Sequence, residues 1–88
     1  MKNPIITGSL ESSDCMVTLF ESDPSMIEID TIVHDAFHDH IKQLVKSVMK
    51  ARDVAHLSVR IQDKGALDYA IRARLETAID RYLEGLHG

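Results

Sequence analysis

The sequence lacks tryptophan and contains one cysteine, two phenylalanines and two tyrosines among its 88 residues. So few aromatic rings argue against a surface that binds nucleic acid by stacking on its bases. A single cysteine can form neither an internal disulfide nor a cysteine zinc site, which suits the reducing cytoplasm. No apolar run approaches the roughly 18 residues of a membrane span, and no signal-peptide core follows the N-terminus. We therefore expect a cytoplasmic protein that binds neither nucleic acid nor a membrane.

Glycine and proline are also scarce, at four and two residues, and the rest of the composition is that of a folded domain. Hydrophobic residues make up 44% of the chain and charged residues 27%, which argues against disorder or low complexity. A chain of 88 residues fits one domain with a small core. We expect residues 1–88 to form that single domain, without an internal repeat or linker.

Charge is distributed unevenly along the chain. Residues 1–40 contain one lysine and eight acidic residues, whereas residues 41–88 contain nine basic and six acidic residues. Such charges are usually solvated surface residues. The alternative is that the acidic half steers the domain towards a basic partner. No basic cluster is interleaved with aromatic residues, which again argues against a nucleic-acid site.

The first third of the chain has the alternating pattern of β-strands. A short extended piece is expected around Gly8, and a strand at residues 15–20 has its apolar face on alternate residues from Cys15. Between them, the small polar residues 11–14 favour a turn. A third strand, at residues 27–30, alternates isoleucine with acidic residues.

The hydrophobic period then changes to that of helices. Apolar residues recur every three or four positions in two stretches, which an alternating strand at residues 57–62 separates. Gly65 divides that strand from the second helix, and Gly85 is expected to end the helix. The two apolar stripes consist of Val33, Phe37, Ile41, Leu44, Val45 and Val48, and of Leu67, Ile71, Leu75, Ile79, Tyr82 and Leu83.

The expected element order is therefore β-β-β-α-β-α. A strand–helix–strand unit joins parallel strands, whereas short turns join antiparallel ones, so the sheet should be mixed. A sheet and two amphipathic helices that share one apolar core pack as two layers. We expect an α+β two-layer sandwich with both helices on one face of the sheet.

Histidines are the first candidates for a functional site. His34 and His38 are four residues apart on the first helix and could share a metal with Asp35 or Asp39. The same spacing also occurs on any exposed polar face, and there is no HExxH pattern and no thiolate partner. We interpret these residues, with His40 and His56, as solvated histidines and expect no metal site.

Cys15 and the acids that flank Gly65 are further candidates. Acidic neighbours would raise the pKa of the Cys15 thiol, so we expect a buried strand residue rather than a nucleophile. Asp63 and Asp68 could form an acid/base pair, but a turn-shaping aspartate and a helix-start aspartate are the simpler interpretation. Lys64 beside the Gly65 helix start could hold an anion such as a phosphate.

Ser12 and Ser13 occupy the first turn, and the residue pattern alone does not distinguish them from an ordinary loop. Two stretches around and beyond them carry a resemblance, in matching order and separation over nearly the whole chain. They are Gly8-Ser9-Leu10-Glu11-Ser12-Ser13-Asp14, and Asp63-Lys64-Gly65-Ala66-Leu67-Asp68 followed by Ile71-Arg72-Ala73-Arg74-Leu75-Glu76. In these stretches the chain resembles the acyl carrier protein (gamma chain) family of bacterial citrate lyase.

In that family, a serine directly after a Leu-Glu pair carries a phosphoribosyl-dephospho-coenzyme A group in phosphodiester linkage. The resemblance therefore implies that this group is the cofactor and that it is attached to Ser12, with Ser13 as the alternative. Two positions depart from the family pattern, which often has glycine at Ser13 and a small residue or cysteine at Tyr69. The Asp-Ser-Leu motif of the four-helix acyl carrier proteins is absent.

The resemblance implies a non-catalytic carrier subunit of the citrate lyase complex. Its arm would carry acetyl and citryl thioesters between the alpha subunit, an acyl transferase, and the beta subunit, a lyase, which convert citrate to acetate and oxaloacetate. A prosthetic-group transferase and the acetate:citrate lyase ligase are the other implied partners. The alternatives are the acyl carrier subunit of malonate decarboxylase and a small interaction module whose serines are never modified.

Two expectations go beyond the family. The phosphates of the arm would rest near Lys64 and Gly65, at the start of the second helix. Met16 and Phe20 would be exposed on the face of the sheet that the helices leave open, where they would dock on a large subunit.

Overall fold

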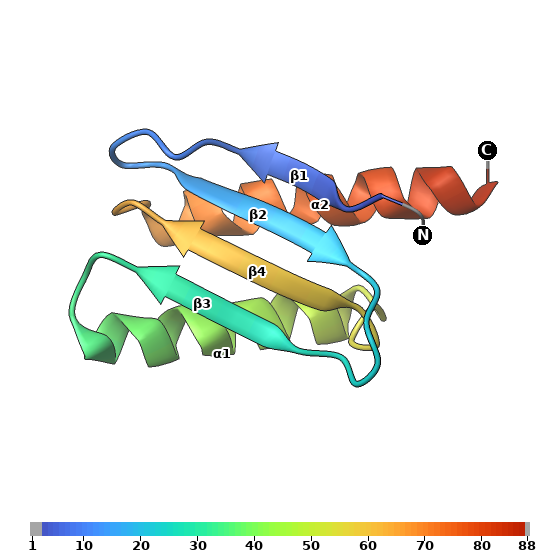
Figure 1. Ribbon diagram of the computed structural model, residues 1–88, viewed down its shortest axis with the longest axis horizontal. Helices are drawn as coiled ribbons and strands as arrows, with labels where there is room; N and C mark the ends of the chain where they lie inside the picture. The colour runs from blue at the N-terminus through green and yellow to red at the C-terminus, as the bar shows by residue number, and fades with distance from the viewer. Residues whose placement is uncertain (1–2, 88) are drawn as a thin grey trace.

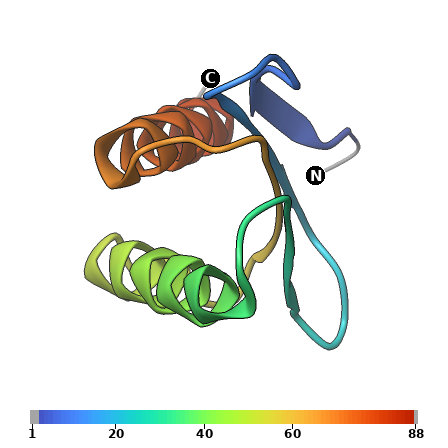
Figure 2. The ribbon, with the colours of Figure 1, turned by 90° about the vertical axis from the view of Figure 1, so that its left-hand side faces the viewer.

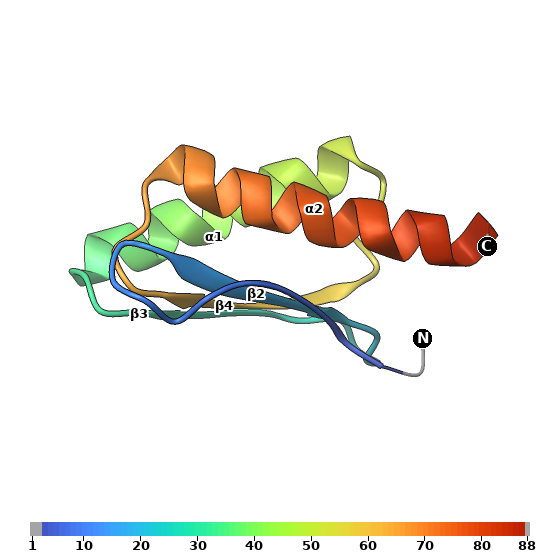
Figure 3. The same cartoon turned by 90° about the horizontal axis from the view of Figure 1, so that it is seen from above.

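The computed structural model describes residues 3–87 and contains four strands and two helices in one sheet-and-helix sandwich (Figure 1). The elements are β1 (Ile5–Gly8), β2 (Cys15–Phe20), β3 (Ile27–Thr31), α1 (Asp35–Ala51), β4 (Ser58–Asp63) and α2 (Asp68–His87). Both helices lie on the same face of the sheet (Figures 2 and 3). The expected α+β class and the order β-β-β-α-β-α are confirmed.

The strands are arranged in the order β1-β2-β4-β3. β2 pairs antiparallel with β1 and β4, whereas β3 and β4 are parallel and are connected through α1. The expected mixed sheet is therefore present. Because β3 and β4 are parallel and each leads into a helix, their carboxyl ends and the starts of both helices lie at one end of the molecule. The β1–β2 turn lies at that same end, which Figure 2 shows facing the viewer.

The core lies between the sheet and the helices. Cys15, Val17 and Leu19 alternate into it from β2, as their spacing predicts, and Val59 and Ile61 do so from β4. Alternation places every second side chain on the covered face. The buried helix residues are Ile41, Val45, Val48 and Met49 of α1 and Ile71, Leu75, Ala78 and Ile79 of α2.

The ends of both helices differ from the expected ones. α1 begins at Asp35, after a cap in which the Nδ1 atom of His34 accepts a hydrogen bond from the Ala36 amide, so Val33 precedes the helix. Phe37 and Leu67 were expected in the core, but their side chains are 55% and 62% exposed. These residues lie where the strands have already ended, so the sheet does not cover them. α2 continues through Gly85 to His87, since a surface helix tolerates glycine at a cost of about 1 kcal/mol.

Candidate functional site

The turn between β1 and β2 presents two serines to solvent. The Asp14 amide closes the turn by donating to the Glu11 carbonyl at 3.1 Å, and the Ser9 amide donates to the Cys15 carbonyl at 3.1 Å. Ser12 and Ser13 are both exposed. Within residues 3–87, neither hydroxyl makes a hydrogen bond to another part of the chain. Both oxygens are therefore accessible to an enzyme that would modify them.

Gly8 ends β1 in a conformation that only glycine adopts easily. Its φ is 81°, and a Cβ atom at this position would lie 1.9 Å from the backbone carbonyl oxygen of Cys15. No real side chain approaches a carbonyl so closely, so glycine is required for the hairpin to close. Backbone geometry thus explains why glycine occupies position 8, the first position of the stretch around the serines.

Ser13 also has a left-handed backbone, with φ of 65°. Its amide donates to the Lys64 carbonyl at 2.8 Å, which holds this conformation. A positive φ at the third residue of a turn favours glycine. The backbone at this position therefore suits glycine better than serine. Ser12, directly before it, has no such restraint.

Asp14 ties the turn to α2. One carboxylate oxygen accepts from the Ser9 hydroxyl at 2.7 Å and the other from the Cys15 amide at 2.7 Å. The Arg74 guanidinium of α2 donates to both oxygens, through Nε at 3.2 Å and Nη2 at 3.0 Å. The Ser9 hydrogen bond, followed by those from Arg74 and Cys15, lowers the pKa of Asp14 to about 2. Asp14 is therefore ionised at neutral pH and serves to position the turn.

The two stretches that carry the resemblance lie side by side. The antiparallel pairing of β2 with β4 continues past its last partners, Cys15 and Asp63, into the two loops. The Lys64 amide donates to the Asp14 carbonyl at 2.9 Å, while its carbonyl accepts from Ser13. Lys64 and Gly65, the expected phosphate contacts, are thus next to the serine turn. Their contact with a phosphate stays a prediction.

Asp63 and Asp68 do not form an acid/base pair. Asp63 is buried, and its Oδ1 atom accepts from the amides of Gly65 at 3.2 Å and Ala66 at 2.9 Å. Its Oδ2 atom accepts from the Thr31 hydroxyl at 2.8 Å. Asp68 lies in the first turn of α2 and contacts His40 Nε2 at 2.6 Å. Asp63 shapes the turn and Asp68 begins the helix, as the sequence predicts.

Cys15 is not suited to nucleophilic chemistry. It is completely buried in the core, and burial, followed by the charges of Asp14 and Asp63, raises the pKa of its thiol to about 11. Only the thiolate is a good nucleophile. The expectation of an inert strand thiol is confirmed.

Three histidines make contacts in or beside α1. His34 caps α1, His40 pairs with Asp68, and His38 Nδ1 lies 3.6 Å from an Asp39 carboxylate oxygen. In the part of the chain that the structure describes, no three His, Cys, Asp or Glu side chains are grouped so as to hold a metal ion. Over the same residues, no helix is both long and apolar enough to cross a membrane.

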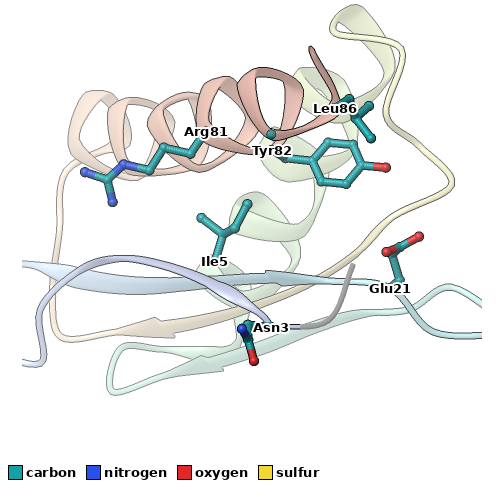
Figure 4. Close-up of a pocket in the computed structure, with 7 residues that line it drawn as sticks. Asn3, Ile5, Glu21, Arg81, Tyr82 and Leu86 are labelled. Atoms are coloured by element: carbon teal, nitrogen blue, oxygen red, sulfur yellow. The ribbon is translucent and has the colours of Figure 1, made fainter. Parts of the chain in front are cut away.

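Two hollows lie at opposite ends of the molecule. One, of about 340 Å³, is bordered by Ile5 of β1 and by Arg81, Tyr82 and Leu86 of α2 (Figure 4). The other, of about 220 Å³, lies between the starts of the two helices, at the end that carries the serine turn. We call the second hollow the interhelical groove; its lining includes Val33, Phe37, Ile41, Gly65, Leu67 and Ile71.

The face of the sheet opposite the helices is open, but its two largest apolar side chains are less exposed than expected. Met16 and Phe20 are half-buried rather than exposed. Phe20 contributes, with Glu28 and Arg60, to a shallow hollow of about 470 Å³. Docking of a large subunit on this face stays a prediction.

Residue patterns did not reveal that Arg74 takes part in the site. Arg74 and Asp14 are 60 residues apart, and no local periodicity connects them. The only signal was that both lie in the two stretches that carry the resemblance.

Comparisons with known proteins find relatives over most of the chain. The family model described as "Malonate decarboxylase delta subunit (MdcD)" matches residues 2–82. The chain is 37% identical over 86 residues to the citrate lyase acyl carrier protein of Halothermothrix orenii, covering 97% of this chain and 92% of that one. It is 40% identical over 83 residues to the protein of the same name from Streptococcus pyogenes serotype M5, covering 92% and 81%.

One solved structure has the same fold. It is a chain in the crystal structure of a Pseudomonas malonate decarboxylase hetero-tetramer in complex with malonate. The TM-score is 0.68, with 23% sequence identity, over 91% of this chain and 84% of that one. At this identity the likeness concerns the fold alone.

Proposed function

This chain belongs to the citrate lyase acyl carrier protein family, and we propose that it carries acyl groups on a phosphoribosyl-dephospho-coenzyme A arm linked to Ser12. The observation that carries the proposal is the Ser12 hydroxyl, exposed and without an intramolecular hydrogen bond among residues 3–87. It lies at the tip of a turn that Asp14 fastens to α2. Residues 1–88 act as a single acyl carrier domain.

Ser12 serves as an anchor and not as a catalytic nucleophile. Asp14, a carboxylate of the same turn, is bound to Arg74 and has a pKa of about 2, so it is a poor proton acceptor at neutral pH. A prosthetic-group transferase would therefore supply the base that activates the hydroxyl. Ser13 is the alternative anchor, but its backbone is held at φ 65° by the bond to Lys64.

The residues around Ser12 fit a tethered phosphodiester group. The loop at Lys64 and Gly65 lies beside the turn, and Lys64 brings a cation to a site at which phosphate charge would accumulate. A Cβ atom at Gly65 would meet nothing within 4 Å, so the space beside the loop is open. When bound, the arm supplies a terminal thiol that holds acetyl or citryl groups as thioesters. A tether of this kind raises the effective concentration of the acyl group at successive active sites.

The partners follow from this role. The alpha subunit of citrate lyase would exchange acetyl for citryl on the arm, and the beta subunit would cleave citryl to oxaloacetate and leave acetyl. The prosthetic-group transferase would attach the arm, and the acetate:citrate lyase ligase would acetylate it. All of these steps use active sites on other chains, so the chain itself is a non-catalytic subunit.

A carrier subunit of malonate decarboxylase is the second candidate. The description of the matching family model and the solved structure of similar fold favour it. The curated relatives at 36–40% identity carry the citrate lyase name, and for that reason we place citrate lyase first.

Reconstitution tests the proposed function. The chain would be produced with its transferase and mixed with the large subunits of either complex, and citrate cleavage and malonate decarboxylation would be measured. We expect citrate cleavage with the modified chain, and none with the unmodified chain or with Ser12→Ala. Malonate decarboxylation alone would replace the first candidate with the second. If the modified chain restored neither reaction, the carrier role in these complexes would be wrong.

A further inference from the structure

The interhelical groove is an apolar hollow at the carboxyl ends of the two parallel strands. Its walls come from the β3–α1 connection and α1 on one side and from the β4–α2 loop and α2 on the other. Phe37 and Leu67, at its mouth, are 55% and 62% exposed, while Ile41 and Ile71 form its buried floor. Small-molecule sites typically combine an apolar lining with a few polar groups in this way.

The groove begins next to the attachment turn. Ser13 is bonded to Lys64, and the following residue, Gly65, lines the groove. Two Cα–Cα steps and one inter-strand spacing therefore separate Ser12 from the groove edge, a path of at most about 15 Å. An arm anchored on Ser12 and built from a nucleotide and a long thiol-bearing chain can span this path. An arm attached to Ser12 would thus stay within reach of the groove.

The charged side chains that line the groove are acidic. Asp63 and Asp68 line it, Asp68 being also in contact with His40 Nε2 at 2.6 Å, and none of the described residues that line it is a lysine or arginine. An apolar wall with two carboxylates favours a small neutral group and disfavours an anion, because the anion would lose its hydration and be repelled. Of the two acyl groups proposed for the arm, acetyl is small and neutral, whereas citryl carries two free carboxylates.

We propose that the interhelical groove binds the acetylated end of the arm and excludes the citrylated end. The inference rests on the proposed function and adds a binding site on the carrier itself. Burial of the acetyl methyl group and the adjoining chain against Phe37 and Leu67 provides the attraction. The acetyl thioester is then shielded from water between turnovers, while the citryl thioester stays in solution and available to a large subunit.

Backbone amide chemical shifts test this directly. The isotope-labelled chain would be recorded unmodified, with the acetyl arm and with the citryl arm, after intact mass has verified each form. We expect shifts at Val33, Phe37 and Leu67 in the acetyl form that are absent in the citryl form. The unmodified chain supplies the baseline.

A matched pair of variants gives a second readout. Leu67→Asp adds a charge at the groove mouth, and Leu86→Asp adds the same charge at the far end of α2, where the leucine is similarly exposed at 63%. A groove occupied nine-tenths of the time slows attack of hydroxylamine on the acetyl thioester about tenfold. We expect Leu67→Asp to remove that protection and Leu86→Asp to retain it. Because both side chains are exposed, both variants should fold.

The outcomes separate this inference from the function. A verified acetyl arm without shifts in the groove, or equal shifts in the citryl form, would overturn the groove proposal and leave the carrier role intact. Shifts that occur only when a large subunit is added would also overturn it, since the groove would then be a protein interface. Absence of any arm, with an active transferase present, would overturn the function and the inference together.

Discussion

The two ends of the sandwich differ in how their apolar residues are covered. At the end that carries the serine turn, three connections and both helix starts meet, and six large apolar side chains are exposed. At the opposite end, beyond the starts of β3 and β4, only Met26 and Leu86 are exposed among the described residues, and Ile6 is exposed between the two ends, on the edge strand β1. The six residues at the serine end are Leu10, Ile32, Val33, Phe37, Leu67 and Tyr69.

The difference has a physical meaning. Gathered apolar exposure on a small domain marks a surface that another group covers. At the serine end this exposure surrounds a turn that is fastened by Asp14, Arg74 and the Lys64 backbone. The serine turn is therefore held in place while the apolar residues around it stay uncovered, an arrangement that suits the arm proposed for Ser12. The opposite end has the hollow of Figure 4, and its β2–β3 connection is held by Ser58, whose hydroxyl contacts Ser22 Oγ and accepts a hydrogen bond from the Met26 amide.

The largest expected change in stability comes from a substitution at Gly8, at the serine end. Gly85, near the opposite end, provides the comparison. Gly8→Val places a Cβ atom against the Cys15 carbonyl and a β-branched residue at φ 81°, so we expect a loss of about 3 kcal/mol or more in unfolding free energy. Gly85→Ala meets nothing within 4 Å and should stabilise α2 by about 0.5–1 kcal/mol. Urea unfolding measures both. If both substitutions changed the free energy of unfolding equally, the close approach of Gly8 to the Cys15 carbonyl would be contradicted.

The reactivity of the Cys15 thiol tests whether β2 is buried directly after the exposed serine turn. With a pKa of about 11, only about a thousandth of the Cys15 thiol is ionised at pH 8, and burial blocks access as well. We expect the unmodified native chain to react with a maleimide at least about a hundredfold more slowly than the urea-unfolded chain. Intact mass against time measures the rate. Rapid native labelling would show that β2 is not buried as described.

Acid should weaken the attachment of the serine turn to α2. The pKa of Asp14 is lowered from 3.8 to about 2, so its stabilising contribution is complete above about pH 4 and is lost as the pH falls towards 2. Arg74→Gln should destabilise the chain at pH 6, and by less at pH 2. The exposed Arg72→Gln, on the same helix, is the control. Urea unfolding of both variants at both pH values measures the loss of stability. If Arg74→Gln and Arg72→Gln lost the same free energy of unfolding at each pH, the role of Arg74 would be contradicted.

The smallest expected effect is the difference in stability between glycine substitutions at Ser12 and at Ser13. Ser13→Gly relieves a left-handed backbone and should stabilise the chain by about 0.5–1 kcal/mol. Ser12→Gly has no such strain to relieve and should be neutral or slightly destabilising. Thermal unfolding of the unmodified variants measures both. A loss of stability in Ser13→Gly would show that the serine side chain, and not the backbone, matters at this position.

The sequence predicted the elements and one face of the sheet well because these follow from local periodicity. Alternation identified Cys15, Val17 and Leu19 as buried, and apolar spacing identified both helices. Periodicity carries no information on where the sheet ends. Phe37 and Leu67 continue their stripes beyond the strands and are exposed for that reason.

Long-range contacts could not be read from local patterns. The order β1-β2-β4-β3 depends on pairings between distant strands. The contact of Arg74 with Asp14 depends on how α2 lies across the sheet. Ser12 entered as a candidate through resemblance alone, and only the structure supplies the physical features that recommend it: exposure, a free hydroxyl and a fastened turn.

The most direct test of the carrier role is the intact mass and peptide map of the chain produced together with its prosthetic-group transferase. Wild type, Ser12→Ala and Ser13→Ala would be compared. We expect a phosphoribosyl-dephospho-coenzyme A adduct in the wild type and in Ser13→Ala, and none in Ser12→Ala. An adduct that is lost only in Ser13→Ala would move the anchor by one residue. No adduct in any form, with a transferase proven active, would contradict the carrier role.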